Sequence, residues 1–162
     1  MAKRDQEVII FALLAAYQNN INTKITEINS EKADSITLNS IDSNAIVLLG
    51  RKFDESLLNY DPVLIMKDVD SEPISVQGAT SYISTVQIDI VIHGDANGNE
   101  QDELRILYRY RRALSEVAEE NARKVGFTDL AINEIPPEFF DLGNQGGLVG
   151  VSSVLLNFTN VG

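Results

Sequence analysis

The sequence predicts an α+β domain: a single, mainly antiparallel sheet with an N-terminal helix and a long central helix packed on one face. Apolar residues recur at helical spacing near the start of the chain and again within residues 99–123. Apolar and polar residues alternate along residues 82–93 and again near the end, along residues 148–159. The chain has 162 residues and no internal repeat, so we expect one domain over residues 1–162.

The first predicted helix covers residues 5–19 and has a broad apolar stripe. Asn19 and Asn20 are expected to end it, because asparagine tolerates the left-handed backbone found at helix ends. Ile25, Ile28 and residues 36–38 then alternate weakly with polar residues, which predicts short strands joined by turns. The stripe of the helix consists of Val8, Phe11, Ala12 and Ala15, with Ile9, Leu13 and Ala16 beside them.

The middle of the chain predicts the two central strands. Residues 45–49 fit either a strand or one helical turn, and residues 51–59 predict a charged loop. Residues 62–66 form a compact apolar strand that begins at a proline. Residues 71–78 predict a loop, residues 82–93 a long strand with one polar face, and residues 94–98 a turn.

The second half predicts a helix followed by two strands. Asn99 is a good N-cap, the helix runs to about Arg123, and Gly126 ends it. A short strand at residues 130–135 is expected to stop at Pro136 and Pro137. We expect a loop over residues 137–147 and a final strand over residues 148–159.

Charge limits the possible partners. The formal net charge is −11 and the pI about 4.4, which excludes binding nucleic acid over a broad basic face. Three interpretations of the acidic balance stay open: a solvated surface, an acidic face that meets the arginines of a neighbouring copy, and an acidic channel along which DNA slides. The bases gather at Arg105, Arg109, Arg111 and Arg112.

Nothing in the sequence predicts catalysis, a metal or a cofactor. There is no cysteine and one histidine, and no signature of a nucleophile or a phosphate-binding loop. Asp89, His93 and Asp95 could be drawn as a metal cluster, but Asp89 and His93 are expected ~13 Å apart along one strand. An enzyme that uses Asp89 and Asp95 with a divalent metal is the third and weakest of the functional alternatives.

No segment approaches the ~20 apolar residues of a membrane span, so no membrane partner is expected. Residues 8–16 follow Lys3 and Arg4 and superficially resemble a signal peptide. Glu7 directly before the apolar run, and the lack of a cleavage site after Ala16, favour a helix of the mature chain. We therefore expect a protein located in the cytoplasm of the cell that makes it.

The order of elements from residue 62 onward is similar to that of the phage tail terminator (head–tail joining) family. The features that carry the resemblance are the strands at residues 62–66 and 84–92, the helix at 102–122 and the last strand at 149–158. The opening helix, residues 6–19, also matches. Residues 25–60 are less typical of the family, so an adaptor, a stopper or a tail completion protein stays open as an alternative.

The resemblance implies a homo-oligomeric ring, commonly of about six copies, in the tail and neck of a virion assembled in the host cytoplasm. Such a ring caps the tail tube, ends its polymerisation and joins it to neck proteins, while genomic DNA passes through without sequence-specific binding. The alternative of another class is a small acidic protein-binding module.

Candidate inter-subunit contacts come from three places. Arg105, Arg109 and Arg112 share one side of the central helix, which fits either an inter-subunit or phosphate contact or a solvated face with intrahelical pairs. The resemblance makes the predicted loops at residues 67–80 and 136–147 candidates for contacts with neighbours or the tube. The residues concerned are Asp68, Asp70 and Glu72 in the first loop and Phe139 and Phe140 in the second.

Overall fold

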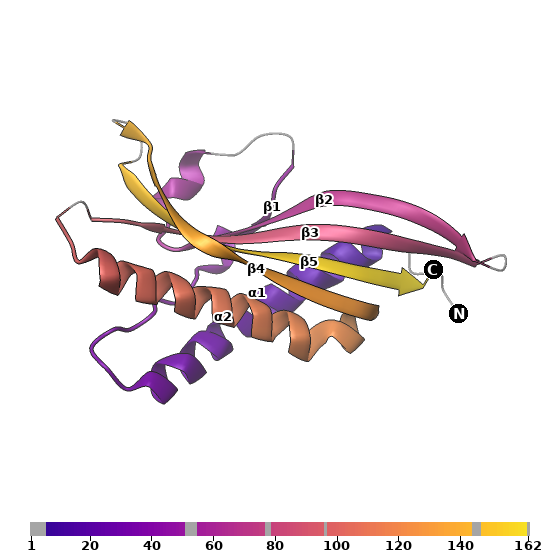
Figure 1. Cartoon of the computed structure of the whole chain (residues 1–162), viewed down its shortest axis with the longest axis horizontal. Helices are drawn as coiled ribbons and strands as arrows, with labels where there is room; N and C mark the ends of the chain where they lie inside the picture. The colour runs from indigo at the N-terminus through magenta and orange to yellow at the C-terminus, as the bar shows by residue number, and fades with distance from the viewer. Residues whose placement is uncertain (1–5, 51–54, 77–78, 96, 144–146, 162) are drawn as a thin grey trace.

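The protein is seen here in a computed structural model that describes residues 6–50, 55–76, 79–95, 97–143 and 147–161. Over these residues it forms two α-helices, two short 3-10 helices and five strands (Figure 1). In chain order they are α1 (Gln6–Lys32), η1 (Ser43–Ala45), β1 (Ile46–Leu48), η2 (Glu55–Asn59), β2 (Val63–Val76), β3 (Ala79–His93), α2 (Glu100–Val125), β4 (Phe127–Asp141) and β5 (Leu148–Val161).

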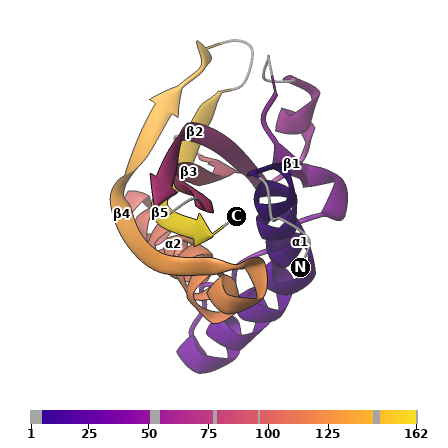
Figure 2. The ribbon, with the colours of Figure 1, turned by 90° about the vertical axis from the view of Figure 1, so that its right-hand side faces the viewer.

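The five strands make one sheet in the order β1-β2-β3-β5-β4. β1 pairs with β2 in parallel, and the other neighbours are antiparallel. Figures 1 and 2 show a strongly twisted sheet with both α-helices on the same face. The predicted fold class is thus confirmed. In the part of the chain that the structure describes, no helix is long and apolar enough to cross a membrane.

The core lies between the sheet and the two helices. Alternate residues of β3 and β5 point at the helices and are fully buried, as the predicted alternation requires. Tyr17 of α1 is also fully buried, and its hydroxyl donates a hydrogen bond of 2.7 Å to the Leu114 carbonyl of α2. Ser152 of β5 donates to the Leu107 carbonyl, which ties the sheet to α2. The inward residues of the two strands are Val86, Ile88, Ile90, Val154, Leu156 and Phe158.

The predicted ends of α2 are confirmed. The Asn99 side chain accepts hydrogen bonds from the backbone of Gln101 and Asp102, which satisfies donors at the first turn. Gly126 ends the helix in the left-handed region at φ 105°, a conformation that a side chain would strain.

The prediction that the first helix ends at Asn19 is wrong, because α1 continues to Lys32. Ile25 and Ile28, predicted in strands, are buried on the same helical stripe as Tyr17 and Ile21. Burial of this stripe against α2 outweighs the weak helix propensity of the asparagines.

The predicted strand at residues 36–38 is also absent, and a loop takes its place. Asn29 of α1 bonds both the N–H and the carbonyl of Leu38, at 2.8 and 3.0 Å. Asn22, seven residues earlier, does the same for Ile41 at 2.7 and 2.9 Å. Two side-chain amides therefore supply the hydrogen bonds that a neighbouring strand would otherwise supply.

Residues 43–48 contain both structures that the sequence allowed, since η1 leads directly into β1. The predicted charged loop at residues 51–59 is wrong for its second half, where η2 forms. Its first half, residues 51–54, lies outside the described residues.

The predicted loop at residues 71–78 is wrong up to Val76, because β2 continues to that residue and pairs with β3. β1 covers only Leu64 to Met66, so the rest of β2 lies at the edge of the sheet. An edge strand tolerates Pro73 because its missing N–H is not needed by a second neighbour. The register shifts between Asp68 and Asp70, and residues 77–78 lie outside the described residues.

The prolines at 136 and 137 do not end the strand as predicted, since β4 runs from Phe127 to Asp141. β4 is the other edge of the sheet, and its register with β5 shifts between Ile135 and Glu138. The irregular pairing at this point of the edge strand accommodates both prolines, which cannot donate a backbone hydrogen bond. The predicted loop at residues 137–147 is therefore wrong up to Asp141, while residues 144–146 lie outside the described residues.

Candidate functional site

The arginines of α2 hold the helix layer together. Arg109 is 9 % exposed, and its guanidinium donates to both carboxylate oxygens of Asp34 and, at 2.9 Å, to the Ile36 carbonyl. The bonds from Arg109 lower the pKa of Asp34 from 3.8 to about 2. Arg109 thus fastens α2 to the loop that follows α1, and its side chain is already engaged within the chain.

Arg112 is engaged in the same way. It donates to Glu31 near the end of α1 at 3.1 and 2.6 Å and to Glu116 of its own helix at 3.2 Å. The hydrogen bond from Arg112 lowers the pKa of Glu31. The intrahelical pair with Glu116 matches one of the two interpretations of the sequence, while the contact with α1 was not foreseen.

Arg105 is the member of the predicted row that stays available. Its side chain is 61 % exposed and meets Asp102 at 3.5 Å, a contact worth little in solvent. Arg105, Arg109 and Arg112 line a hollow of about 390 Å³ together with Lys32 and Tyr108. Most of the positive charge there is offset by the partners already described.

Two further cations belong to this layer: Arg111, which lies off the predicted row of arginines, and Lys24, which the sequence did not single out. Arg111 donates to the Ile135 carbonyl of β4 at 3.0 Å and lies 4.9 Å over the Tyr108 ring. Lys24 of α1 is buried and bonds Glu120 at 2.6 Å and Glu27 at 2.8 Å. The pKa of Lys24 is raised by these bonds, first by Glu120. Lys24 lies three residues after Ile21 and four before Ile28, and this helical spacing could have placed Lys24 on a helix in the sequence.

The acidic candidates of the first predicted loop lie on β2 instead. Asp68, Asp70 and Glu72 are exposed along the edge part of the strand, on either side of the register shift. Burial, and then the charge of Asp70, raises the pKa of Asp68. They are accessible to a neighbouring molecule, as an inter-subunit contact requires.

The aromatic pair of the second predicted loop lies on β4, with its two rings on opposite faces of the sheet. Phe139 is half-buried and packs against the core, while Phe140 is exposed. Of the two, Phe140 is available for a contact between molecules.

The Phe140 side chain lies on the face of the sheet that is turned away from α1 and α2. We name this face the outer face. The outer face consists of the residues of β3 and β5 that alternate with the buried core residues. Polar side chains on it form hydrogen bonds with one another across the strands. Thr85 donates to Asn157 at 2.8 Å. Gln87 donates to the two oxygens of Asp89 at 3.0 and 3.2 Å, and Ser153 donates to Asp89 as well.

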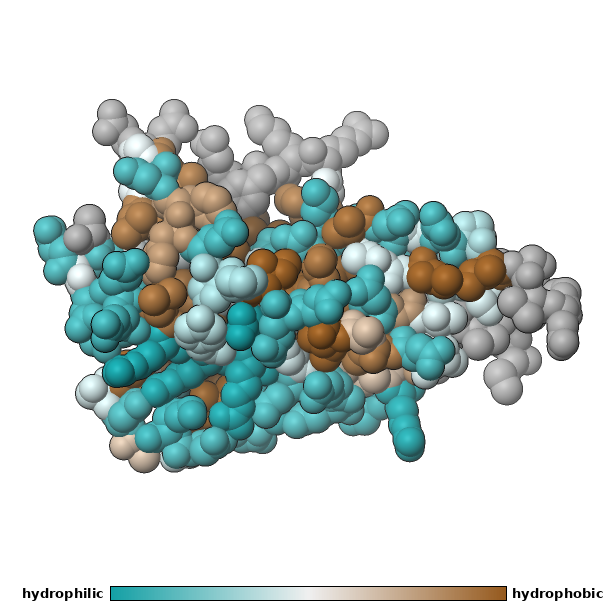
Figure 3. All heavy atoms as spheres, in the orientation of Figure 1, coloured by the Kyte–Doolittle hydropathy of each residue, from teal (hydrophilic) through white to brown (hydrophobic). Residues whose placement is uncertain are grey.

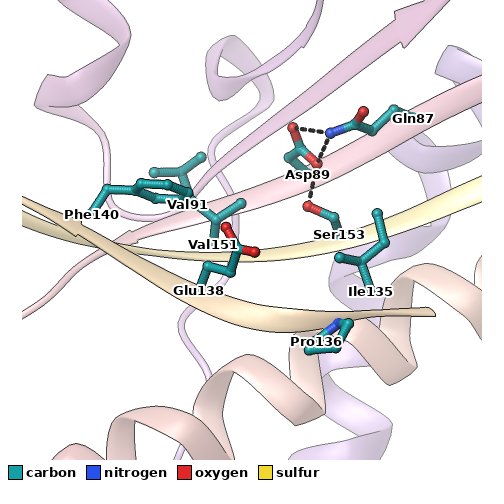
Figure 4. A pocket seen from close by; sticks show the side chains of 9 residues that line it. All are labelled: Gln87, Asp89, Val91, Ile135, Pro136, Glu138, Phe140, Val151 and Ser153. Atoms are coloured by element: carbon teal, nitrogen blue, oxygen red, sulfur yellow. Dashed lines mark hydrogen bonds between the residues drawn. The ribbon is translucent and has the colours of Figure 1, made fainter. Parts of the chain in front are cut away.

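The outer face is hollowed over β3, β5 and β4, with a volume of about 300 Å³. Figure 4 shows Gln87, Asp89 and Ser153 together on one side of this hollow, with Glu138 between them and Phe140. The remaining lining residues are Val91, Ile135, Pro136 and Val151. We name this the outer-face hollow. The sequence did not reveal it, because the prolines of β4 hid the strand that supplies Glu138 and Phe140.

The residues drawn from the sequence as a possible metal cluster do not converge. His93 approaches the Leu58 carbonyl at 2.6 Å with Nε2, and Asp95 accepts from the backbone of Asn97. Across the described ranges, no group of three or more histidine, aspartate or glutamate side chains could hold a metal ion.

No protein-family model matches the chain, and no curated protein matches its sequence.

Proposed function

We propose that the chain is a structural subunit of a phage head–tail connector, which forms a ring that caps the tail tube, ends its polymerisation and joins it to the neck. The proposal is carried by one observation: two hairpins project from the sheet at opposite ends, and each exposes apolar side chains. The order of helices and strands, on which the resemblance to tail terminators is based, also supports the proposal.

The two ends offer different surfaces. The hairpin of β2 and β3 exposes Val69 and Ile83, at 48 % and 49 % of their area. The hairpin of β4 and β5 exposes Phe140 and Leu142, at 45 % and 44 %. Figure 1 shows these hairpins pointing away from one another. When unlike surfaces at opposite ends bind each other, copies join head to tail, and such contacts close into a ring if the rotation allows.

The part of β2 beyond β1, and β4, lie at the sheet edges and carry features that hinder open-ended strand pairing. β2 has its register shift and Pro73, with Asp68, Asp70 and Glu72 nearby. β4 has two prolines and its own shift. Such features keep edge strands from adding further strands without limit. Contacts through side chains at the hairpins are then favoured, as in an assembly of defined size.

The surface chemistry fits a channel through which DNA moves. In Figure 3 the helix side, along the lower edge, is mostly hydrophilic, while hydrophobic residues surface over the strands. The charge of −11 repels phosphates, so DNA would not adhere to the ring.

The test is the mass of the purified protein by light scattering, followed by negative-stain imaging with and without tail tubes. We expect rings, formed alone or on tube ends. Ile83→Ser and Phe140→Ser, one at each hairpin, should each abolish them, because a head-to-tail contact needs both surfaces. Phe11→Ser is the matched control, since Phe11 is 54 % exposed on α1, outside both hairpins. A stable monomer that ignores tail tubes and neck proteins would contradict the proposal.

The second candidate function is a small acidic protein-binding module. The outer-face hollow favours it, because a hollow lined by acidic and apolar side chains needs no ring to bind a partner. A protein that stays monomeric with tail tubes and neck proteins, and whose outer face binds another protein, would support this function and exclude the first.

A further inference from the structure

The outer-face hollow differs from the rest of the surface in how its charge is arranged. Asp89 of β3 and Glu138 of β4 reach it from different strands, and none of its nine lining residues is basic. Neither carboxylate forms an ion pair with any residue that the structure describes. Lys67 lies opposite Gln87 in the strand register, yet it pairs with neither acid. Two negative charges thus share a recess that supplies no cation.

The carboxylate of Asp89 is held in place by neutral donors. Gln87 spans both of its oxygens through one amide nitrogen, and Ser153, itself 7 % exposed, donates from the neighbouring strand. These bonds fix the direction of the carboxylate without neutralising it (Figure 4). Each carboxylate oxygen has two lone pairs, so positions for further donors stay open.

The remaining walls are apolar. Val91, Val151 and Ile135 form them, and the Phe140 ring stands at one end. The volume of about 300 Å³ is at the small end of protein ligand sites. A recess of this size, with an anionic end and an apolar stem region, suits a long cationic side chain that packs its methylenes and presents its charge.

We propose that the outer-face hollow receives an arginine side chain from a partner protein. The methylenes lie against Val91 and Val151, and the guanidinium donates to Asp89 and Glu138. Arginine fits better than lysine because its planar group can donate to two carboxylates at once. The hollow opens on an exposed face, so the side chain can enter while the backbone that carries it stays outside.

The test uses N-acetyl-arginine amide as the probe, titrated into the whole protein and followed by backbone amide NMR. We expect saturable shifts confined to the strands around Gln87, Val91 and Ser153. N-acetyl-citrulline amide, which has the same shape without the charge, should give none. The double variant Asp89→Asn/Glu138→Gln should weaken binding at least about tenfold, because it removes both charged acceptors.

Asp129→Asn is the matched control, since Asp129 is an exposed acid on β4 outside the hollow, and it should bind as the wild type does. The single variant Asp89→Asn repeats the test with a smaller change, and circular dichroism checks that each variant folds. Shifts that fail to saturate, or that persist in the double variant, would overturn the proposal. Equal binding of N-acetyl-lysine amide would overturn the choice of arginine.

The proposal does not depend on the ring. A protein that stays monomeric when tail tubes and neck proteins are added, but whose hollow binds the arginine probe, contradicts the connector function and supports this inference. Rings whose hollow does not bind the probe support the connector function and contradict this inference.

Discussion

The helix layer and the outer face of the sheet differ in whether their charged side chains are paired. Between α1 and α2, Lys24, Arg109 and Arg112 each meet carboxylates from a distant part of the chain. On the outer face, neutral donors bond Asp89, and neither Asp89 nor Glu138 forms an ion pair with a described residue. The first arrangement joins elements of one molecule, whereas the second leaves charge available to another molecule.

This difference separates structural charge from functional charge. The sequence showed a row of arginines that fitted either an inter-subunit contact or intrahelical pairs, and in the fold Arg109 and Arg112 bond distant parts of their own chain. The unpaired acids lie singly on two strands: the sequence drew Asp89 into a possible metal cluster, and nothing in it pointed to Glu138. Pairing, which only the fold determines, decides which charges serve a partner.

The largest expected effect tests the helix layer. Arg109→Ala removes the paired bonds to Asp34 and the bond to the Ile36 carbonyl, and should lower the free energy of unfolding by about 2 kcal/mol. Arg105→Ala, on the same helix but exposed, should change it by less than about 0.5 kcal/mol. Urea unfolding followed by circular dichroism measures both. Equal effects would show that Arg109 does not fasten the layers.

The parts of the fold that the sequence predicted share one property. β3, β5 and α2 each bury one face against the core, so their hydrophobic period is visible along the chain. The second half of α1 escaped because Asn19 and Asn20 predicted a helix end, whereas the helix continues and its Asn22 and Asn29 bond loop residues 19 and 9 positions away. β2 and β4 escaped because their prolines sit at sheet edges, where no second neighbour needs the missing N–H.

The candidate site was less predictable for a related reason. The arginines could be placed on one helix, but Asp34 and Glu31 lie 75 and 81 positions away in sequence. The hollow needs three strands side by side, and the sequence predicted that one of them, β4, ends at Pro136. Local patterns give the period of a strand, and the pairing of strands depends on contacts between distant residues.

A pH series sharpens the comparison with a smaller effect. Because the pKa of Asp34 is lowered from 3.8 to about 2 in the fold, its ionised form stabilises the protein above 3.8. That contribution is lost as the pH falls through about 2. Asp34→Asn should therefore be less stable than the wild type at neutral pH, with a difference that shrinks between these two values. Thermal unfolding of both proteins across this pH range measures the difference in stability. A difference that stays constant would mean that the charge of Asp34 contributes nothing.

The smallest effect is expected on the outer face, where a charge should matter to a partner and hardly to the fold. Glu138 is exposed on an edge strand and makes no ion pair with a described residue, so Glu138→Gln should change the free energy of unfolding by less than about 0.5 kcal/mol. The same variant should weaken the binding of N-acetyl-arginine amide measurably. Urea unfolding and the NMR titration are run on one sample. A large loss of stability with unchanged binding would place Glu138 with the structural charges of the helix layer, and the contrast between the two regions would fail at that residue.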